Sequence, residues 1–543
     1  LLAAVSVVAF YALYATFVDP PQPLGYAPPR RTLQHAQFLR SAPPAQDARA
    51  ARVRDAARHV FASFKGNAWG DEDIDPLTGK GRGRGGAERN GWGGFAVEAS
   101  TTLALMGMWD EFQECLAHVL EKVDFQDGGV GTVDPLLAKG RYFGALVSLV
   151  DMADDGLISD DLVDRRKRID LLANLWHIDV RVGHAQWTES KLPVPRVNLS
   201  HLQDLPDAQA RTRLTVDPAH AATMLLPENA AFGLVASNNR YSSISNEAWP
   251  LLVTNESLGD SRGLVPAPIN VTSAEPVGNE RHWDEGHGFY YDTLLKTSIH
   301  TPKDRYTFNY LARWNQSATA VRRSLTSRSL PSDEHLKQHL FLGRLNGSSF
   351  VNEQSQSACA APGTLILGGA HLSLPSFVTL GQALLEACHH VYHTSPIQLG
   401  PQAWSWSSMP LSPNDTITPP NTNAKRERSA KGYWIADYRY TFDPSYFASL
   451  FYAWRITGEQ RYRDWAWEAF VAIDKRCKTK YGFAGLRDIS DKSTTLANIL
   501  DPSVAAADVL LVLRYLWLIF VDVDVGSLDH WVFTTFGGVL RRR

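Results

Sequence analysis

The sequence predicts an all-α fold that closes into a toroid or a solenoid. Apolar residues recur at helical spacing in many segments, whereas strand-like alternation is short and scattered. Long polar loops rich in Gly, Pro and Asn join these segments, and no fixed-period repeat is visible. The expected helices fall in residues 48–64, 101–123, 141–153, 221–237, 290–299, 377–392, 446–458, 462–476 and 505–520.

Residues 48–543 are expected to form one domain, because no break in composition divides them. Residues 1–18 are an uninterrupted apolar stretch that is long enough to cross a bilayer. No basic region or small-residue cleavage site stands out there, so a transmembrane signal anchor is favoured over a cleaved signal peptide or a buried core helix. Residues 19–47 are rich in proline and are expected to form a stem.

Composition and charge limit the classes of partner. The chain has 543 residues, 44% of them hydrophobic and 20% charged, as in ordinary globular proteins. Its net charge of −3 indicates neither nucleic acid nor an anionic membrane surface as a partner. The 16 Trp, 18 Tyr and 23 Phe residues could stack on sugars, but filling the core is the more common role of aromatic side chains.

Glycosylation sequons and cysteines indicate the compartment. Six N-x-S/T sequons follow the apolar N-terminal stretch, which favours a lumenal or extracellular body. In such an oxidising compartment some of the four cysteines should pair. A bridge between Cys359 and Cys388 would close a loop of about 30 residues, which the chain-entropy model values at about 3 kcal/mol. Cys115 lies in a helical pattern and is expected to be a buried free thiol. The sequons are at Asn198, Asn255, Asn270, Asn315, Asn346 and Asn414.

A histidine cluster, His389, His390 and His393, follows Cys388. One helical turn separates His389 from His393, and this spacing would allow both to bind one metal ion. No acid pairs with these histidines in the sequence, so a solvated helix end is the preferred interpretation. No CxxC or Cys/His spacing indicates a zinc site.

Several segments resemble the motifs of one known family, in the same order along the chain. They are AWGDEDIDPLTG (68–79), VEASTTLALMGMWDEF (97–112), GRYFGALVSL (140–149), YYDTLLK (290–296), SPIQLGPQ (395–402), YFASLFYAWRITGEQRYRDWAWEAFVAI (446–473) and SLDHWVFTTFGG (527–538). Together they resemble glycoside hydrolase family 47, the calcium-dependent class I α-1,2-mannosidases. The resemblance implies an (α/α)7 barrel with a sugar site in its mouth, and a disulfide between Cys359 and Cys388.

The resemblance places the family's three catalytic carboxylates on residues that cannot replace them. Inverting hydrolysis needs one carboxylic acid to protonate the leaving oxygen and one carboxylate to activate water. The corresponding positions are Leu137, Gly288 and Gln402. Leu and Gly have no proton to give, and the amide of Gln402 cannot take a proton from water at neutral pH. No residue of this chain is therefore assigned as catalytic from the motifs alone.

Other positions of the family's site are retained. Four residues match positions that the resemblance assigns to substrate binding: Arg141, Glu228, Tyr290 and Tyr291. Glu228 is also a possible surrogate acid, as are Asp284 and Glu285, which lie shortly before Gly288. An exposed turn is the alternative interpretation of Asp284 and Glu285, and a buried acid paired with an arginine is the alternative for Glu228.

The resemblance implies that Thr535 binds calcium through its hydroxyl and carbonyl oxygens. Calcium takes six to eight hard oxygen ligands, and in the family carboxylates hold the waters around the ion. Here Phe536 and Gly537 follow Thr535 in place of acids, and Ser445 and Ala448 replace two more. Asp292 stands where the family has Glu. The expectation of a calcium cofactor is therefore in doubt.

Three functions stay open. The preferred one is an α-1,2-mannosidase-like protein of the secretory pathway that handles high-mannose N-glycans or glycoproteins but is weak or inactive as a hydrolase, that is, a pseudoenzyme. The alternatives are an active inverting, calcium-dependent mannosidase with relocated acids, and a non-catalytic lectin or scaffold. We expect a monomer in the ER or Golgi membrane, type II with a lumenal domain, or a secreted form.

Overall fold

The computed structural model describes most of the expected domain and little of the segment before it. The expected anchor at 1–18 and most of the expected stem lie outside the described residues. Among the helices that are described, none is long and apolar enough to cross a membrane. The described residues are 32–35, 44–83, 91–126, 132–183, 188–198, 208–223, 226–237, 250–254, 263–303, 307–333, 337–408, 418–490 and 499–543.

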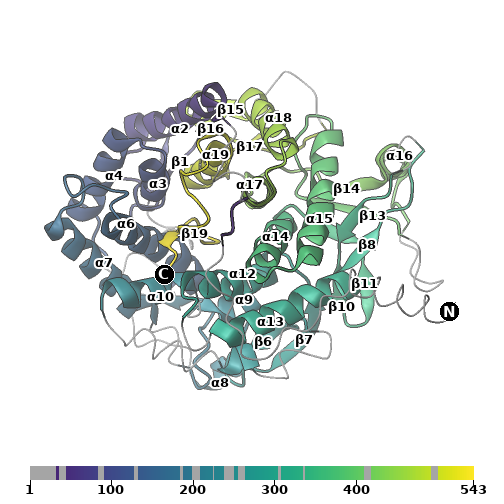
Figure 1. Cartoon of the computed structure of the whole chain (residues 1–543), viewed down its shortest axis with the longest axis horizontal. Coiled ribbons are helices and arrows are strands. Elements are labelled where there is room, and N and C mark those ends of the chain that lie inside the picture. Colours follow the sequence, from purple (N-terminus) through teal and green to yellow (C-terminus); the bar gives the residue numbers. More distant parts are fainter. Residues whose placement is uncertain are drawn as a thin grey trace, which may run out of the picture.

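Helices in two layers form a closed ring (Figure 1). In the described part of the chain, seven inner helices pack each against the next, and the last packs against the first. In ring order they are α3 (Gly94–Leu105), α6 (Gly144–Asp154), α10 (Pro227–Val235), α12 (Glu285–His300), α14 (Ala360–Leu372), α17 (Ser445–Thr457) and α19 (Ala506–Phe520). The predicted toroid of helices is confirmed, although the fold is mostly helical and not purely so, because small sheets lie between the helices.

Outer helices pack against the inner ones from outside. They are α4 (Trp109–Glu121) on α3, α7 (Arg165–Gly183) on α6, α13 (Thr307–Ala320) on α12, α15 (Pro375–Thr394) on α14, α18 (Arg461–Arg476) on α17 and α2 (Asp47–Asn67) on α19. Shorter helices are α5 (Pro135–Leu137), α8 (Ala208–Arg211), α9 (Pro218–Ala221) and α16 (Thr422–Lys431). Single π-helical or 3-10 turns are η2 (Ala138–Phe143), η5 (Pro250–Thr254), η7 (Val321–Leu325) and η8 (Ser357–Cys359).

The sequences of inner and outer helices explain their layers. Nearly every residue of α19 is buried, because α3 and α17 flank it inside the ring and α2 covers it from outside. The outer helix α4 instead buries Phe112, Cys115, Leu116 and Val119, which recur at helical spacing, and turns Glu114 to solvent. Cys115 is the buried free thiol that the sequence predicts.

Short antiparallel strands build small sheets between the helices. One sheet has five strands in the order β11-β10-β7-β6-β5, and another has the order β12-β13-β14. Their bounds are β5 (Thr215–Val216), β6 (Ala267–Asn270), β7 (Pro276–Arg281), β10 (Arg344–Asn346), β11 (Ser349–Val351), β12 (Glu353–Ser355), β13 (Ala403–Trp406) and β14 (Tyr433–Asp437). The two-stranded pairs are β1 (Asp73–Ile74) with β2 (Gly81–Arg82), β3 (Thr132–Val133) with β4 (Val197–Asn198), β8 (Thr326–Arg328) with β9 (Leu340–Leu342), β15 (Lys478–Thr479) with β16 (Gly482–Phe483), and β17 (Gly485–Leu486) with β18 (Leu500–Asp501).

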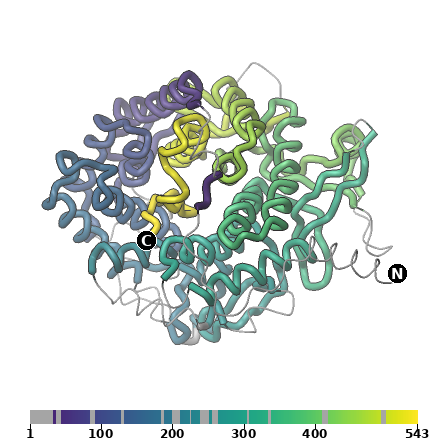
Figure 2. The backbone as a smooth tube through the Cα atoms, in the orientation of Figure 1, coloured from purple at the N-terminus to yellow at the C-terminus, as the bar shows by residue number. Residues whose placement is uncertain are grey.

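The last strand pair lies inside the ring. Figure 2 shows the yellow C-terminal segment there, beside the short described piece of the N-terminal segment. This pair is β19 (Trp531–Phe533) with β20 (Val539–Arg541), and Val532 lies opposite Leu540. Gln34 joins the interior, since its side-chain amide donates to the carbonyl of Val523 at 3.2 Å. Because β19 and β20 both belong to this central segment, the turn that joins them also lies inside the ring.

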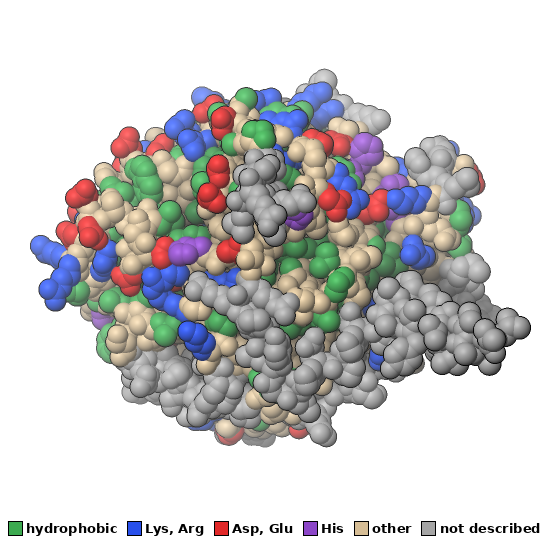
Figure 3. Space-filling view, viewed as in Figure 1, with side chains coloured by type: hydrophobic (Ala, Val, Ile, Leu, Met, Phe, Trp, Pro, Cys, Tyr) green, Lys and Arg blue, Asp and Glu red, His purple; other side chains and the backbone are tan. Residues whose placement is uncertain are grey.

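A disulfide joins Cys359 to Cys388, as the resemblance implies. Cys359 ends η8 directly before α14, and Cys388 lies on α15, so the bond connects the inner and outer layers. On the face shown in Figure 3, basic and acidic side chains are interspersed over the described surface. This mixture agrees with the small net charge.

Candidate active site

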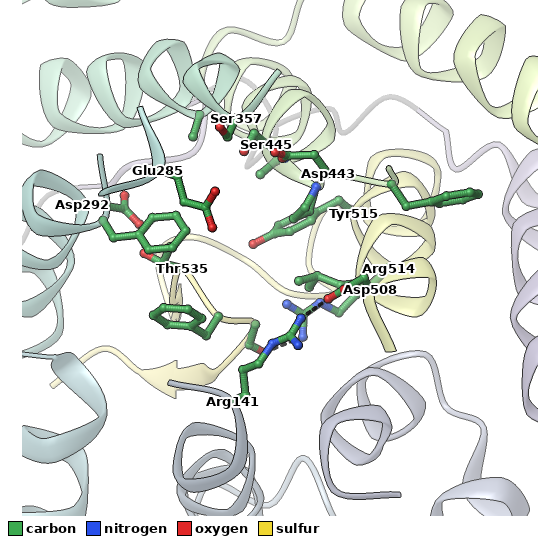
Figure 4. Close-up of a pocket in the computed structure, with 18 of the residues that line it drawn as sticks. Arg141, Glu285, Asp292, Ser357, Asp443, Ser445, Asp508, Arg514, Tyr515 and Thr535 are labelled. Carbon is green, nitrogen blue, oxygen red and sulfur yellow. Dashed lines mark hydrogen bonds and ion pairs between the residues drawn. The ribbon is translucent and has the colours of Figure 1, made fainter. Parts of the chain in front are cut away.

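A cavity of about 380 Å³ opens inside the ring (Figure 4). Its walls come mainly from the inner helices, and the turn between β19 and β20 contributes Thr535, Phe536 and Gly537. We call these three residues the cavity floor. The inner layer and the central turn thus build a concave site of the kind that holds small ligands.

Helix α12 presents one stripe of side chains to the cavity. Glu285, Phe289, Asp292 and Lys296 all line it, because their spacing places them on one face of the helix. Gly288 is buried beside this stripe, near Trp283, and does not line the cavity. A catalytic side chain is therefore absent from this position of α12, although its neighbours face the site.

The other two expected acid positions lie in the cavity wall. Leu137 and Gln402 both line the cavity. The side-chain oxygen of Gln402 accepts a hydrogen bond from the hydroxyl of Thr441 at 2.8 Å, and its backbone N–H donates to the carbonyl of Arg439 at 2.8 Å. These contacts hold the amide of Gln402 in the cavity wall, at one of the positions where the resemblance leads us to expect a carboxyl group.

Arg141, an expected substrate-binding residue, does line the cavity. Its guanidinium forms an ion pair with Glu98 at 3.3 Å and another with Asp508 of α19. Figure 4 shows Arg141 extending toward Asp508. The three side chains make a charged group in the wall that can donate to and accept from sugar hydroxyls.

The cavity floor is tied to α12 by a network around Asp292. The ammonium group of Lys296 lies 2.5 Å from this carboxylate, and Thr364 donates to it at 3.0 Å. The hydroxyl of Thr535 also donates to Asp292. Burial alone would lower the pKa of Lys296, but the charge of Asp292 outweighs it and holds this pKa above its ordinary value. Asp292 is therefore already neutralised by a neighbouring cation.

These residues do not fit a calcium ion at Thr535. The Thr535 hydroxyl points its proton at Asp292, and the Lys296 ammonium lies against the same carboxylate, where it would repel a divalent cation. The next floor residue is Phe536, whose ring packs against Phe289 at 5.1 Å between centroids. Gly140 permits this packing, because a Cβ there would lie 2.1 Å from the Phe536 ring. A hard-oxygen shell of six to eight ligands has no counterpart among these groups.

Two acids without an ion pair to any described residue share the cavity: Glu285 at the start of α12, and Asp443, which Pro444 separates from α17. Figure 4 shows them on neighbouring parts of the wall. The surrounding protein and the charges of Asp443, Asp284 and Asp217 raise the pKa of Glu285 to about 7, although its side chain reaches solvent. Burial raises the pKa of Asp443 to about 6, even though Ser445 donates to it. Both carboxyl groups can therefore change protonation near neutral pH.

Asp443 was not among the residues selected from the sequence. The resemblance aligns Asp443 with the arginine of an Arg-Pro-Glu motif of the family. The replacement of a basic residue by an acid next to the expected site was the signal in the sequence that could have selected it. Asp284, by contrast, caps the N-terminus of α12: it accepts from the backbone of Glu285 at 2.7 Å and from the hydroxyl of Ser355 at 2.6 Å. Asp284 therefore stabilises the start of α12 as an N-cap residue.

Glu228 lies behind the cavity wall. It is completely buried on α10, packed against Gly144 and Gly538, and does not line the cavity. Burial raises its pKa to about 7, although nearby Thr534 and Lys296 lower it in part. No arginine forms an ion pair with it among the described residues.

Tyr290 and Tyr291 also lie away from the cavity. The hydroxyl of Tyr290 donates to the carbonyl of Leu252 at 2.6 Å, and the hydroxyl of Tyr291 accepts from the backbone N–H of Val265 at 3.1 Å. Both rings are buried. The structure thus places these tyrosines in contacts that fix α12, and brings Arg141, Glu285 and Thr535 together in the cavity.

An inner and an outer ring of helices around a deep cavity define the class of protein: an (α/α)7 barrel of the glycosidase type. The chain belongs to glycosyl hydrolase family 47, whose model matches residues 56–542. It is 27% identical over 464 residues to the mannosyl-oligosaccharide α-1,2-mannosidase of Penicillium citrinum, covering 83% of each chain. It is 28% identical over 505 residues to the mannosyl-oligosaccharide α-1,2-mannosidase 1B of Aspergillus phoenicis, covering 92% of each chain. The solved α-1,2-mannosidase from Trichoderma reesei has the same fold, with a TM-score of 0.80 at 21% identity, over 92% of this chain and 100% of that one.

Proposed function

We propose that this chain binds the α-1,2-linked mannose of high-mannose N-glycans in its barrel cavity and does not catalyse the calcium-dependent inverting hydrolysis of its family. One observation carries the proposal: the cavity is retained, while Leu137 and Gln402 line the wall where the carboxyl groups would act. A cavity can still bind a sugar without them, because binding needs hydrogen bonds and apolar contact but no proton transfer.

The lining of the cavity supports glycan binding. Aromatic rings of Phe289, Tyr515 and Phe536 lie in it, and such rings stack on the apolar faces of sugars. Arg141 and Asp508 present charged hydrogen-bonding groups in the same wall. Charge-assisted hydrogen bonds of this kind are about twice as strong as neutral ones.

The secretory pathway is the proposed location, with residues 1–18 as a type II membrane anchor in the ER or Golgi. The disulfide between Cys359 and Cys388 supports an oxidising compartment. Asn346, the last residue of β10, is exposed directly before the turn to β11, where an oligosaccharide could be attached.

A second candidate is hydrolysis by relocated acids. Glu285 and Asp443 favour it, because both line the cavity with raised pKa values and without an ion pair to a described residue. An acid that stays protonated near pH 6–7 can serve as a general acid, and a neighbouring carboxylate as a base. This reaction would not use calcium.

The test is to incubate the purified full chain with a nine-mannose N-glycan at pH 5, 6 and 7, with calcium or with a chelator, and to follow the glycan masses. We expect unchanged masses together with saturable binding of the same glycan. Loss of hexoses that Glu285→Gln and Asp443→Asn both abolish would replace the proposal with the second candidate. Loss of hexoses that depends on calcium and survives both substitutions would overturn both.

Two arginine variants, one inside the cavity and one outside it, test whether the glycan binds in the cavity. Arg141→Met removes a charged donor from the wall and is expected to weaken glycan binding about ten- to a hundredfold, as for a lost hydrogen bond to a charged group. Arg439→Met removes an exposed arginine paired with Asp437 outside the cavity and should leave binding unchanged. Equal affinities for the two variants would mean that the cavity is not the glycan site.

A further inference from the structure

The histidine cluster on α15 meets an acid that is distant in the sequence. Among the described residues, ligand atoms of His389, His393 and Glu468 all lie within 4.8 Å of one another. His389 and His393 are one turn apart on α15, and Glu468 comes from α18. Both are outer helices that pack against α17, so this cluster lies in the outer layer of the barrel.

The ring of His389 is held in one orientation. It stacks on Trp465 of α18, with centroids 3.9 Å apart and an interplanar angle of 8°. Its Nδ1 lies 3.0 Å from the hydroxyl of Tyr446, a buried residue of α17. An Nδ1–H that donates to this hydroxyl leaves the lone pair on Nε2, the arrangement in which metal-binding histidines are usually held.

Glu468 is positioned by two partners. His393 contacts one of its oxygens through Nδ1 at 2.6 Å, and the side-chain amide of Gln398 donates to the same oxygen at 3.0 Å. The side chain of His393 is 56% exposed and that of Glu468 is 26% exposed, so an ion from solvent can reach both. His390 does not take part, since its Nε2 lies 2.8 Å from the carbonyl of Lys431 on another side of the helix.

We propose that His389, His393 and Glu468 form a binding site for a divalent transition metal ion of the zinc class. Two imidazoles and one carboxylate are a ligand set that zinc accepts, with water in the fourth position. Oxygen-preferring calcium and magnesium do not favour imidazole ligands, which distinguishes this site from the calcium site of the family. Binding of the ion at Nδ1 of His393 would replace the hydrogen bond to Glu468, and the single proton of the neutral ring would then lie on Nε2.

The ion would connect two outer helices. α15 is joined to the inner layer by the disulfide at Cys388, directly before His389. A metal bound to α15 and α18 would add a second link on the outer side, across α17. Among the described residues the guanidinium of Arg461 lies near the site, and Glu459 pairs with it at 2.7 Å. The surrounding charge therefore does not prevent binding of a divalent ion.

The test uses Zn²⁺ and Co²⁺ as probes on the full chain after removal of metal by a chelator. We expect one Zn²⁺ per chain by titration calorimetry, an increase of about 2–3 °C in Tm at a hundredfold excess over Kd, and visible absorption from tetrahedral Co²⁺. His393→Ala, an exposed change, should abolish all three signals without changing the Tm of the metal-free protein. Glu468→Gln should do the same or weaken binding at least tenfold.

Matched controls separate a built site from general affinity of surface side chains. Glu386→Gln alters an exposed acid on the same helix, and His177→Ala removes a histidine from α7; both should bind Zn²⁺ as the unchanged chain does. Tyr446→Phe keeps the ring but removes the hydroxyl at His389, and should weaken Zn²⁺ about ten- to a hundredfold. No saturable binding by the unchanged chain, or binding that survives His393→Ala, would overturn the proposal.

Discussion

Helices α12 and α15 each place two titratable side chains one turn apart, with different consequences. On α12 the pair is Asp292 and Lys296, buried at the cavity and in direct contact. On α15 the pair is His389 and His393, in the outer layer and turned toward an acid of another helix. Identical spacing therefore gives a neutralised pair in one place and an open ligand set in the other. The type of residue, and not its spacing, decides whether a position can bind an ion.

The largest expected effect follows from breaking the pair on α12. Lys296→Met leaves the carboxylate of Asp292 buried without its cation, and we expect a loss of about 3–5 kcal/mol in the free energy of unfolding. Urea denaturation followed by circular dichroism measures it. The double variant Asp292→Asn/Lys296→Met should recover much of the loss, because it leaves no buried charge.

An exposed pair with the same spacing provides the control. Asp474 and Lys478 lie 3.6 Å apart on α18 and β15, with side chains 25% and 44% exposed. Lys478→Met should cost less than about 1 kcal/mol, because Lys478 is exposed and Asp474 keeps its ion pair with Arg52. Similar losses at Lys296 and Lys478 would show that the α12 pair is not desolvated as the structure indicates.

A smaller effect is expected from Glu228, the buried acid behind the cavity wall. Its pKa is about 7 in the folded chain, against an ordinary value of 4.5, so the folded state keeps this proton to higher pH than the unfolded state. Its contribution to stability is complete below pH 4.5 and is lost as the pH rises to about 7. Glu228→Gln removes this loss, and should therefore raise the stability relative to the unchanged chain by on the order of 2 kcal/mol at pH 8.

The comparison of two pH values isolates this cause. At pH 4.5 the unchanged chain and the Glu228→Gln variant should differ by less than about 0.5 kcal/mol, because the acid is protonated in the folded state and still half protonated in the unfolded state. Glu386→Gln on the outer helix α15 should show no such trend, since its carboxylate is in an exposed ion pair with Lys337. A Glu228→Gln variant that is equally destabilised at both pH values would point to a lost packing contact instead.

The sequence predicted the helical layers well because burial leaves a periodic pattern. The stripe of Phe112, Cys115 and Val119 fixes the inward face of α4 without any knowledge of the ring. The closure of the ring did not follow from periodicity, since it depends on contacts such as α19 with α3, whose residues are about 400 positions apart. That feature came from resemblance to a family.

The site was harder to predict because distant segments build it. Glu285 was selected from its distance to Gly288, and it lines the cavity. Asp443 was not selected, because its proximity to Glu285 arises only when the ring places α12 and α17, on either side of α14, around one cavity. Glu468 was missed for the same reason, since it lies on α18, far in sequence from His393. The chemistry of a single residue can be predicted from the local sequence. A pair of residues on different helices can be predicted only when the arrangement of those helices is known.

The smallest expected effect is that of calcium on the cavity floor. In the His393→Ala variant, which lacks the proposed zinc site, a calcium chelator acts on the floor alone. We expect its Tm to change by less than about 1 °C, and added millimolar calcium to change it as little, because the hydroxyl of Thr535 and the ammonium of Lys296 already occupy the carboxylate of Asp292. An ion bound tightly at Thr535 would stabilise the native state by about 2.7 kcal/mol at a hundredfold excess over Kd, which a thermal scan detects. A drop of several degrees on chelation would therefore mean that calcium displaces Lys296 from Asp292, and that the floor of this barrel binds the ion as the family resemblance implies.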